Sequence, residues 1–178
     1  MSDERVGSEA WEERVAALWA EIDAVEGGEF RARMEELVAE RGDGDAVAVF
    51  ELGAACDSTG VPAEAVRHYR RALELGLSGV RRRRAVIQLA SSLRNLGRPD
   101  RSVELLLVER DLPDTRLDAD ERALAPAVDA FLALALADTG RDREAASLAL
   151  GALAPLLPRY NRSLAHYARA LLTAPDGS

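Results

Sequence analysis

Apolar residues recur every three or four positions along most of this chain, which places them on one face of an α-helix. Trp11, Val15 and Leu18 begin such a face near the N-terminus, and Ile22 and Val25 continue it up to Gly27-Gly28, where we expect that helix to end. The pattern therefore predicts a helical chain. The same spacing recurs in the segments 30–37, 49–56, 65–72, 86–93, 102–106, 132–136, 145–152 and 160–171.

Three short phrases separate pairs of these segments, and each begins with a glycine: Gly60, Gly97 and Gly140. In the first two phrases a proline follows two residues later, at Pro62 and Pro99. Glycine readily adopts the left-handed conformation that ends a helix, and proline suits the first turn of the next helix. Each phrase therefore predicts a tight corner, and three corners predict three helical hairpins.

These hairpins resemble the tetratricopeptide repeat, in which bulky and small residues alternate in a fixed order on two helices. The first hairpin reproduces that order and spacing with Val49, Leu52-Gly53, Cys56, Ala65, Tyr69 and Ala72. The second departs at Ser102 and Glu109, where the family has Ala, and the third departs at Ala149, where an aromatic is usual. The corners are also spaced more widely than the family period of about 34 residues.

Part of this excess length falls in the acidic segment 111–120, which contains Pro113. Proline and clustered aspartates predict an extended loop, whose end at Asp118–Asp120 offers an N-cap for the next helix. The Gly42–Asp45 segment likewise predicts a linker that ends in a helix cap.

The resemblance implies an all-α fold: an α-α superhelix of antiparallel helix hairpins, a tetratricopeptide-repeat-like solenoid of about nine helices. We expect one helical repeat domain over residues 9–173, with disordered tails at 1–8 and 174–178. Its predicted parts are an N-terminal helix pair at 9–41, repeats at 45–77, 79–110 and 119–154, and a capping helix at 159–173 whose buried stripe is Tyr160, Leu164, Tyr167 and Leu171.

The composition indicates which residues form the core, and the charge and the length of the apolar stretches exclude several kinds of partner. Hydrophobic residues make up 48% of the chain and aromatics only 4%, so the core must consist largely of Ala, Leu and Val. The formal net charge of −8 repels a phosphate backbone, so no nucleic-acid partner is expected. The longest apolar stretch, Ala130–Ala137, is too short to span a bilayer, so no membrane partner is expected either.

The basic residues are all arginine and the N-terminus is polar, without the features of a secretory signal. Together with a lone cysteine, Cys56, these features favour a protein of the bacterial cytoplasm. Cys56 occupies a helix-core position, and His68 and His166 lie far apart in the chain. No metal-ligand spacing, phosphate loop or nucleophile motif is found, so we expect no enzyme activity, no metal and no cofactor.

In the family, the first helix of each hairpin lines a concave groove that binds a peptide. Carried over position by position, the resemblance implies a groove formed by Phe50, Ala54 and Asp57 in the first repeat, Arg84, Ile87, Gln88, Ser91, Arg94 and Asn95 in the second, and Ala130, Phe131, Leu134 and Asp138 in the third. The alternative is that these residues are merely solvated or packed against a flanking helix.

Some members of the family clamp the C-terminal carboxylate of heat-shock chaperones with Lys, Asn and Arg. The matching positions here are Phe50, Ala54, Gln88, Ala127 and Phe131. Because they retain almost none of those donor side chains, a chaperone adaptor is disfavoured.

The run Arg81–Arg84 permits two interpretations. Arginine forks could bind an acidic peptide or a phosphate, or the run could form one solvated helical turn. Charge runs are usually solvated faces, which favours the second interpretation. Of the four arginines in the run, only Arg84 then reaches the predicted groove.

The sequence thus favours a protein- or peptide-binding module that acts as a scaffold or adaptor, with a partner that it does not identify. One alternative is a structural protein that self-associates, for example as a homodimer, which the apolar run Leu105–Val108 would support. Another is a regulatory protein that senses a small ligand or a signalling peptide.

Overall fold

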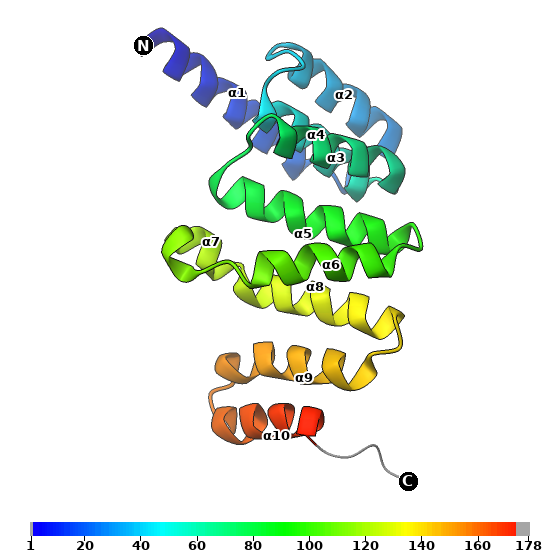
Figure 1. The fold of residues 1–178 in the computed structure, drawn as a ribbon. Coiled ribbons are helices and arrows are strands. Elements are labelled where there is room, and N and C mark those ends of the chain that lie inside the picture. Colours follow the sequence, from blue (N-terminus) through cyan, green and yellow to red (C-terminus); the bar gives the residue numbers. More distant parts are fainter. Residues whose placement is uncertain (1, 174–178) are drawn as a thin grey trace. The chain divides into compact units, whose positions relative to one another are not determined.

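The computed structural model describes the backbone of residues 2–173 and the side chains of residues 7–173. This part of the chain contains ten α-helices, two short 3-10 turns and no strand (Figure 1). The prediction of an all-α fold built from antiparallel hairpins is confirmed. The tail predicted at 174–178 lies outside the described residues, whereas α1 begins at Ser2, inside the segment for which the other tail was expected.

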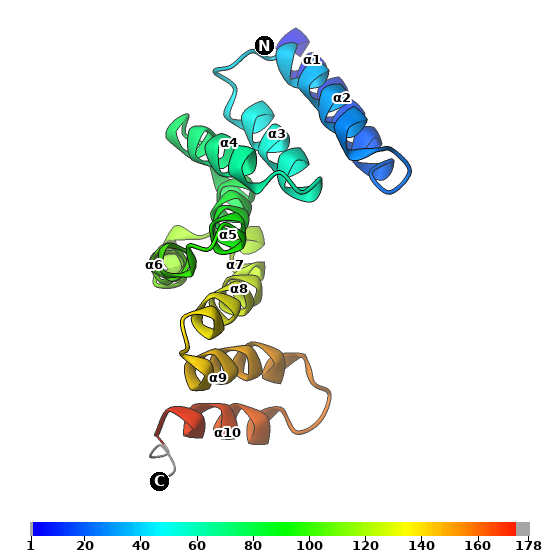
Figure 2. The ribbon, with the colours of Figure 1, turned by 90° about the vertical axis from the view of Figure 1, so that its right-hand side faces the viewer.

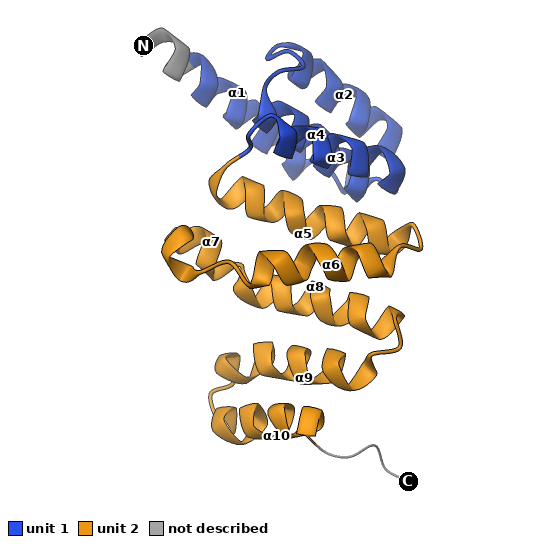
Figure 3. Cartoon of the chain, viewed as in Figure 1, with its two compact units in different colours: residues 1–77 blue, residues 78–178 orange. Residues whose placement is uncertain are grey.

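The chain divides into two compact units, residues 1–77 and residues 78–178, each of which is described by itself (Figure 3). The sequence predicted a single repeat domain over residues 9–173. Both units consist of helices that pack against their neighbours in the chain, as Figure 2 shows for α9 and α10.

The first unit contains α1 (Ser2–Ala20), α2 (Gly27–Ala39), α3 (Ala46–Ser58) and α4 (Pro62–Glu74). Two tryptophans of α1 anchor it to the rest of the unit. The indole N–H of Trp11 donates a hydrogen bond to the Leu37 carbonyl at 2.7 Å, and that of Trp19 donates to the buried Glu51 carboxylate at 2.9 Å. The core of this unit contains Trp11, Val15, Leu18, Phe30, Met34, Val38, Ala48 and Ala55.

The first helix ends earlier than its apolar pattern predicts. It stops at Ala20, and Gly27-Gly28 begins α2 instead of ending α1. The Glu26 carboxylate explains why these glycines begin a helix, because it accepts hydrogen bonds from the Gly28 and Glu29 N–H groups and so caps α2.

The second unit contains α5 (Gly79–Asn95), α6 (Pro99–Arg110), α7 (Ala119–Ala123), α8 (Ala125–Asp138), α9 (Asp142–Leu153) and α10 (Asn161–Thr173). Helix α8 packs against α5, α6 and α9, and α10 packs against α9. The core of this unit contains Ile87, Ala90, Val103, Leu106, Val128, Leu132, Ala133, Ala135, Leu136 and Ala145.

The predicted corners are confirmed. Gly60, Gly97 and Gly140 have positive φ angles of 79°, 72° and 77°. The residue after each glycine donates its N–H to the carbonyl oxygen of the residue five positions before it, at 2.9–3.0 Å. This hydrogen bond is the one that defines the Schellman motif. A fourth corner of this kind, at Gly76, ends α4 with a φ angle of 86°.

The acidic segment 111–120 is more structured than the predicted loop. It contains the 3-10 turn Asp114–Arg116 and the start of α7, the helix by which the structure exceeds the predicted nine. The predicted cap is present: Asp118 accepts from the Glu121 N–H at 2.7 Å, and Glu121 accepts from the Asp118 N–H at 3.1 Å. Reciprocal bonds of this kind form a capping box, which explains why a short helix begins here.

Candidate functional site

The groove positions predicted in the first unit are mostly covered. Phe50 and Ala54 of α3 are buried, with exposed fractions of 0% and 2%, and Asp57 is half-buried. The Phe50 ring lies against Tyr69 of α4, with 6.0 Å between the ring centroids. Phe50 and Ala54 therefore belong to the packing of the first unit and do not present their side chains to a ligand.

The groove positions predicted in the second unit lie on α5 and α8, which pack against each other. Two of them form an ion pair between the helices, since Arg94 Nε lies 2.5 Å from Asp138 Oδ2. Ile87 is buried in the core, whereas Leu134 is 46% exposed. The structure thus brings together predicted residues from two hairpins.

We refer to these accessible groove positions as the α5–α8 face. Arg84 and Asn95 are exposed, whereas Gln88, Ser91 and Phe131 are half-buried. The side-chain carbonyl of Gln88 is buried without a hydrogen-bond partner, so an acceptor remains unsatisfied beneath this face. The face comprises Arg84, Gln88, Ser91, Arg94, Asn95, Ala130, Phe131, Leu134 and Asp138.

The Arg81–Arg84 run proves to be neither an open anion site nor a solvated turn. Arg82 donates two hydrogen bonds to Glu109, at 2.8 and 2.6 Å, and its Nε lies 3.6 Å from a carboxylate oxygen of Glu121. Arg83 is only 2% exposed and lies 3.6 Å from the same Glu109 carboxylate. Because two arginines of the run are already paired inside the unit, the interpretation as one solvated turn is corrected.

The sequence pointed to this buried ion cluster only indirectly. Glu109 stands where the repeat pattern has Ala, and it is 3% exposed. A carboxylate at a core position needs a charged partner, because burying an unpaired charge is costly. The departure from the repeat pattern was therefore the signal. The hydrogen bond with Glu109 raises the pKa of Arg82, which keeps this guanidinium charged.

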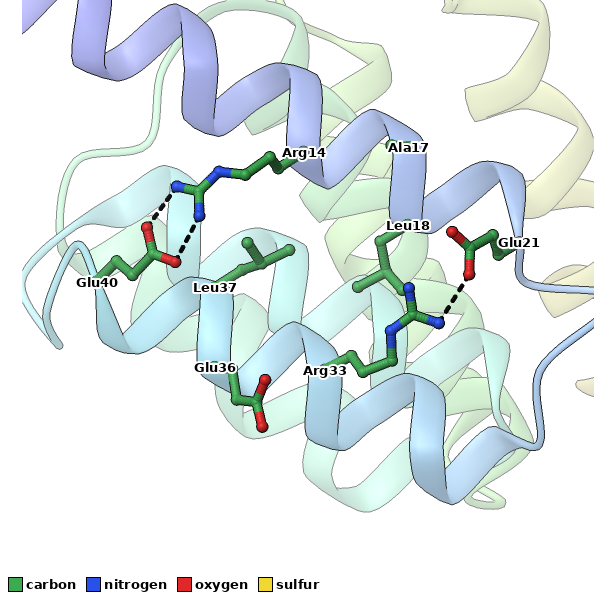
Figure 4. Close-up of a pocket in the computed structure, with 8 residues that line it drawn as sticks. All are labelled: Arg14, Ala17, Leu18, Glu21, Arg33, Glu36, Leu37 and Glu40. Carbon is green, nitrogen blue, oxygen red and sulfur yellow. Dashed lines mark hydrogen bonds and ion pairs between the residues drawn. The ribbon is translucent and has the colours of Figure 1, made fainter.

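A cavity of about 350 Å³ lies between α1 and α2 in the first unit (Figure 4). Arg14 forms an ion pair with Glu40 across it, and Arg33 donates to Glu21 at 2.7 Å. These side chains are largely exposed and form ion pairs with one another, so they link the two helices. No feature of the sequence pattern indicated this cavity.

A second cavity, of about 330 Å³, lies in the second unit among α6, α8, α9 and α10. Its charged lining is largely paired, with Arg110 Nε at 2.8 Å from Asp129 and Arg141 bound to Glu144 through two hydrogen bonds. Its apolar lining comes from Leu107, Leu132, Leu136, Leu148 and Leu172.

The chain offers little for catalysis at the positions considered from the sequence. Burial raises the pKa of the Cys56 thiol, which is 4% exposed and therefore a poor nucleophile. Burial lowers the pKa of the half-buried His68. Within the described part of the chain, no cluster of three or more His, Cys, Asp or Glu residues could hold a metal ion. No helix in that part is long and apolar enough to cross a membrane.

Comparison with known proteins gives the family. A family model described as a tetratrico peptide repeat matches residues 46–171. A search of curated proteins returned no match, and neither did a search of solved structures. The family match begins with α3 and extends into α10, further than the three hairpins that carried the resemblance in sequence. Because it spans most of the chain, and because the chain folds into antiparallel helical hairpins with Schellman corners, the chain belongs to the tetratricopeptide-repeat family.

Proposed function

We propose that this chain is a scaffold or adaptor that binds a segment of a partner protein on the α5–α8 face. The family is in general a non-enzymatic repeat that mediates protein interactions. Its first helices line the binding groove, and α5 and α8 are the first helices of adjacent hairpins. The proposed function is therefore binding without catalysis. We propose the cytoplasm as its location, which the composition of the sequence favours.

The observation that carries this proposal is the ion pair between Arg94 and Asp138, which joins α5 to α8 at predicted groove positions. It holds a charged pair beside Leu134, whose side chain is 46% exposed. Polar groups that fix orientation next to an apolar anchor are what an extended or helical peptide requires.

Crosslinking from a single position tests this proposal. A photoreactive amino acid replaces Leu134, and a control variant carries it at Arg101 of α6, whose side chain is 70% exposed but lies outside the face. A partner protein should crosslink from position 134 and not from position 101. Equal crosslinking from both positions would refute binding on the α5–α8 face.

Self-association remains a second candidate, because the run Leu105–Val108 leaves one apolar residue in solvent. Leu106 is fully buried and Leu105 and Leu107 are half-buried, whereas Val108 is 70% exposed. Light scattering separates the candidates: a concentration-dependent dimer that Val108→Asp abolishes would favour self-association. Sensing of a small ligand would instead raise the melting temperature when that ligand is added.

A further inference from the structure

The C-terminal part of the second unit exposes several large apolar side chains. Here the large apolar side chains that remain exposed are Leu153 at 44%, Leu156 at 71%, Tyr160 at 77%, Tyr167 at 66% and Leu172 at 58%. The predicted buried stripe is thus only partly buried: Leu164 and Leu171 are half-covered, and Ala168 is the one fully buried residue of α10.

The sequence of this segment repeats every seven residues. Tyr160-Asn-Arg162-Ser-Leu164 is followed by Tyr167-Ala-Arg169-Ala-Leu171, so Tyr, Arg and Leu each recur at the same place. Tyr160 precedes α10 and has a positive φ angle of 66°, so the helix itself carries only Tyr167. The two arginines and the two leucines lie within α10, and residues seven apart lie almost on the same side of a helix.

This spacing places the two arginines in one row along α10 and the two leucines in another. Helix α10 packs against α9, and Leu164 and Leu171 of the leucine row are half-buried. Tyr167 lies three and four residues from the two leucines, so it borders that row on one side. Arg162 and Arg169 lie on nearly the opposite side of the helix from the leucines, and Arg169 lines the cavity together with Ala168 and Leu172. Between the tyrosine and arginine edges the exposed side of α10 carries Ser163 and His166, with the half-buried Ala170, which leaves room for a second helix to approach.

The charge of this segment is opposite to that of the chain. Arg159, Arg162 and Arg169 are exposed, and no Asp or Glu occurs between Ala145 and Thr173. None of these three arginines has an ion-pair partner among the side chains that the structure describes, whereas the chain as a whole carries a net charge of −8. Unpaired arginines beside an apolar edge attract a partner that combines carboxylates with apolar side chains.

We propose that the exposed side of α10 docks an acidic amphipathic helix of another protein. The apolar residues of that helix pack on Tyr167 and the small residues, and its carboxylates bind Arg162 and Arg169. A second copy of this chain fits poorly, because a symmetric pair of α10 helices would oppose two rows of arginine. An anionic lipid surface also fits poorly, since the negative charge of the rest of the chain opposes its approach.

Fluorescence anisotropy with a synthetic probe tests the proposal. The probe is a labelled three-heptad peptide with Leu and Ile on its seam and Glu on the flanking positions, and the matched control peptide carries Lys in place of Glu. The full chain should bind the Glu peptide and not the Lys peptide. Arg162→Glu combined with Arg169→Glu should weaken binding at least about tenfold, which corresponds to about 1.4 kcal/mol.

A second pair of substitutions controls for net charge. Arg70→Glu with Arg98→Glu changes the charge equally at two exposed arginines outside α10 and should leave the affinity within about twofold. Tyr167→Ala should weaken binding, whereas Tyr167→Phe should bind the peptide as the wild type does, because the ring supplies the apolar contact. Circular dichroism checks that each variant keeps its helix content.

Several outcomes would overturn the proposal. These are absence of binding to the Glu peptide, equal weakening by both pairs of substitutions, and equal binding of the two peptides. Concentration-dependent dimers of the chain alone that the α10 substitutions abolish would assign the surface to a second copy. Cosedimentation with phosphatidylserine vesicles that the same substitutions abolish would assign it to a membrane. Because none of these substitutions touches the α5–α8 face, failure here leaves the crosslinking result at Leu134 unaffected.

Discussion

Gly53 of α3 lies close against Tyr69 and His68 of α4. A Cβ atom at this position would lie 3.0 Å from Tyr69 Cδ1 and 3.1 Å from His68 Cβ. Both distances are shorter than ordinary van der Waals contact. The small residue that the repeat pattern places here is therefore a packing requirement, and the Tyr69 ring closes the space that a side chain would fill.

Replacing Gly53 with Leu should destabilise the fold by about 1–3 kcal/mol, because the added side chain overpacks the contact between α3 and α4. Urea denaturation measures the change. Gly151→Leu in α9 provides the matched control, since a Cβ atom there would meet nothing within 4 Å. That variant should be neutral or more stable, because leucine favours a helix more than glycine does. Equal losses for the two variants would show that the contact with Tyr69 is unimportant.

Each helix of the chain also depends on how its ends are satisfied. Asp45 caps α3 by accepting hydrogen bonds from the Val47 and Ala48 N–H groups, at 2.9 and 3.0 Å, and it pairs with Arg41. Burial disfavours the charged form of Asp45, but the hydrogen bonds from Ala48 and Arg41 outweigh this effect, so the pKa of Asp45 lies below its ordinary value.

Because the folded protein holds the pKa of Asp45 below that of the unfolded chain, the charged cap stabilises the fold above the unfolded value of about 3.9. This contribution is lost as the pH falls through the lower, folded pKa. Asp45→Ala should therefore lower the free energy of unfolding by about 1 kcal/mol at pH 7, and the difference from wild type should shrink below about pH 4. Urea titrations at neutral and acidic pH measure both, and a difference that grows in acid would contradict the assignment.

The buried ion cluster ties the ends of three helices together, since its charges come from α5, α6 and α7. Glu109→Ala should destabilise the fold by about 3–5 kcal/mol, because it leaves Arg83 buried without its carboxylate partner. Thermal unfolding measures this loss. Glu104→Ala, on the same helix, removes only the exposed pair with Arg101 and should change stability by less than about 0.5 kcal/mol. Similar effects of the two substitutions would rule out a special role for the buried cluster.

The elements of this fold could be predicted from sequence because their signals are local. Glycine at a helix end, aspartate at a helix start and apolar spacing within a helix each act over a few residues, and the corners at Gly60, Gly97 and Gly140 follow from them. The Arg82–Glu109 pair could not be predicted in the same way, since it depends on how close two helices come. The exposure of Tyr167 was missed for a similar reason, because periodicity shows that a stripe is apolar but not whether another helix covers it.

The candidate site could likewise be predicted only in part from the sequence. The resemblance to the repeat family named the groove positions, and in the second unit the structure brings Arg94 and Asp138 together as an ion pair. In the first unit the corresponding Phe50 and Ala54 are buried, because Tyr69 and the surrounding core enclose them. A pattern of positions thus indicates which helix faces a groove, while burial decides which of its residues a partner can reach.

In both units, helices pack mainly on their neighbours in the chain, and the two apolar clusters described above consist of separate sets of residues. The stability of such an array is the sum of local terms, so damage should spread only to adjacent helices. Leu132 is 1% exposed in the core of the second unit, and Phe30 is fully buried in that of the first.

Leu132→Ala should cost about 2–5 kcal/mol, because it opens a cavity in a packed core. We expect this loss to accelerate backbone amide exchange in α6, α8 and α9 while α2 exchanges at its wild-type rate. Phe30→Ala should give the converse pattern, with faster exchange in α1 to α3 and little change in α9. Hydrogen exchange with mass spectrometry under native conditions resolves these helices. Uniform acceleration along the chain in both variants would mean that the array unfolds as one cooperative block, and the local account of its stability would then be wrong.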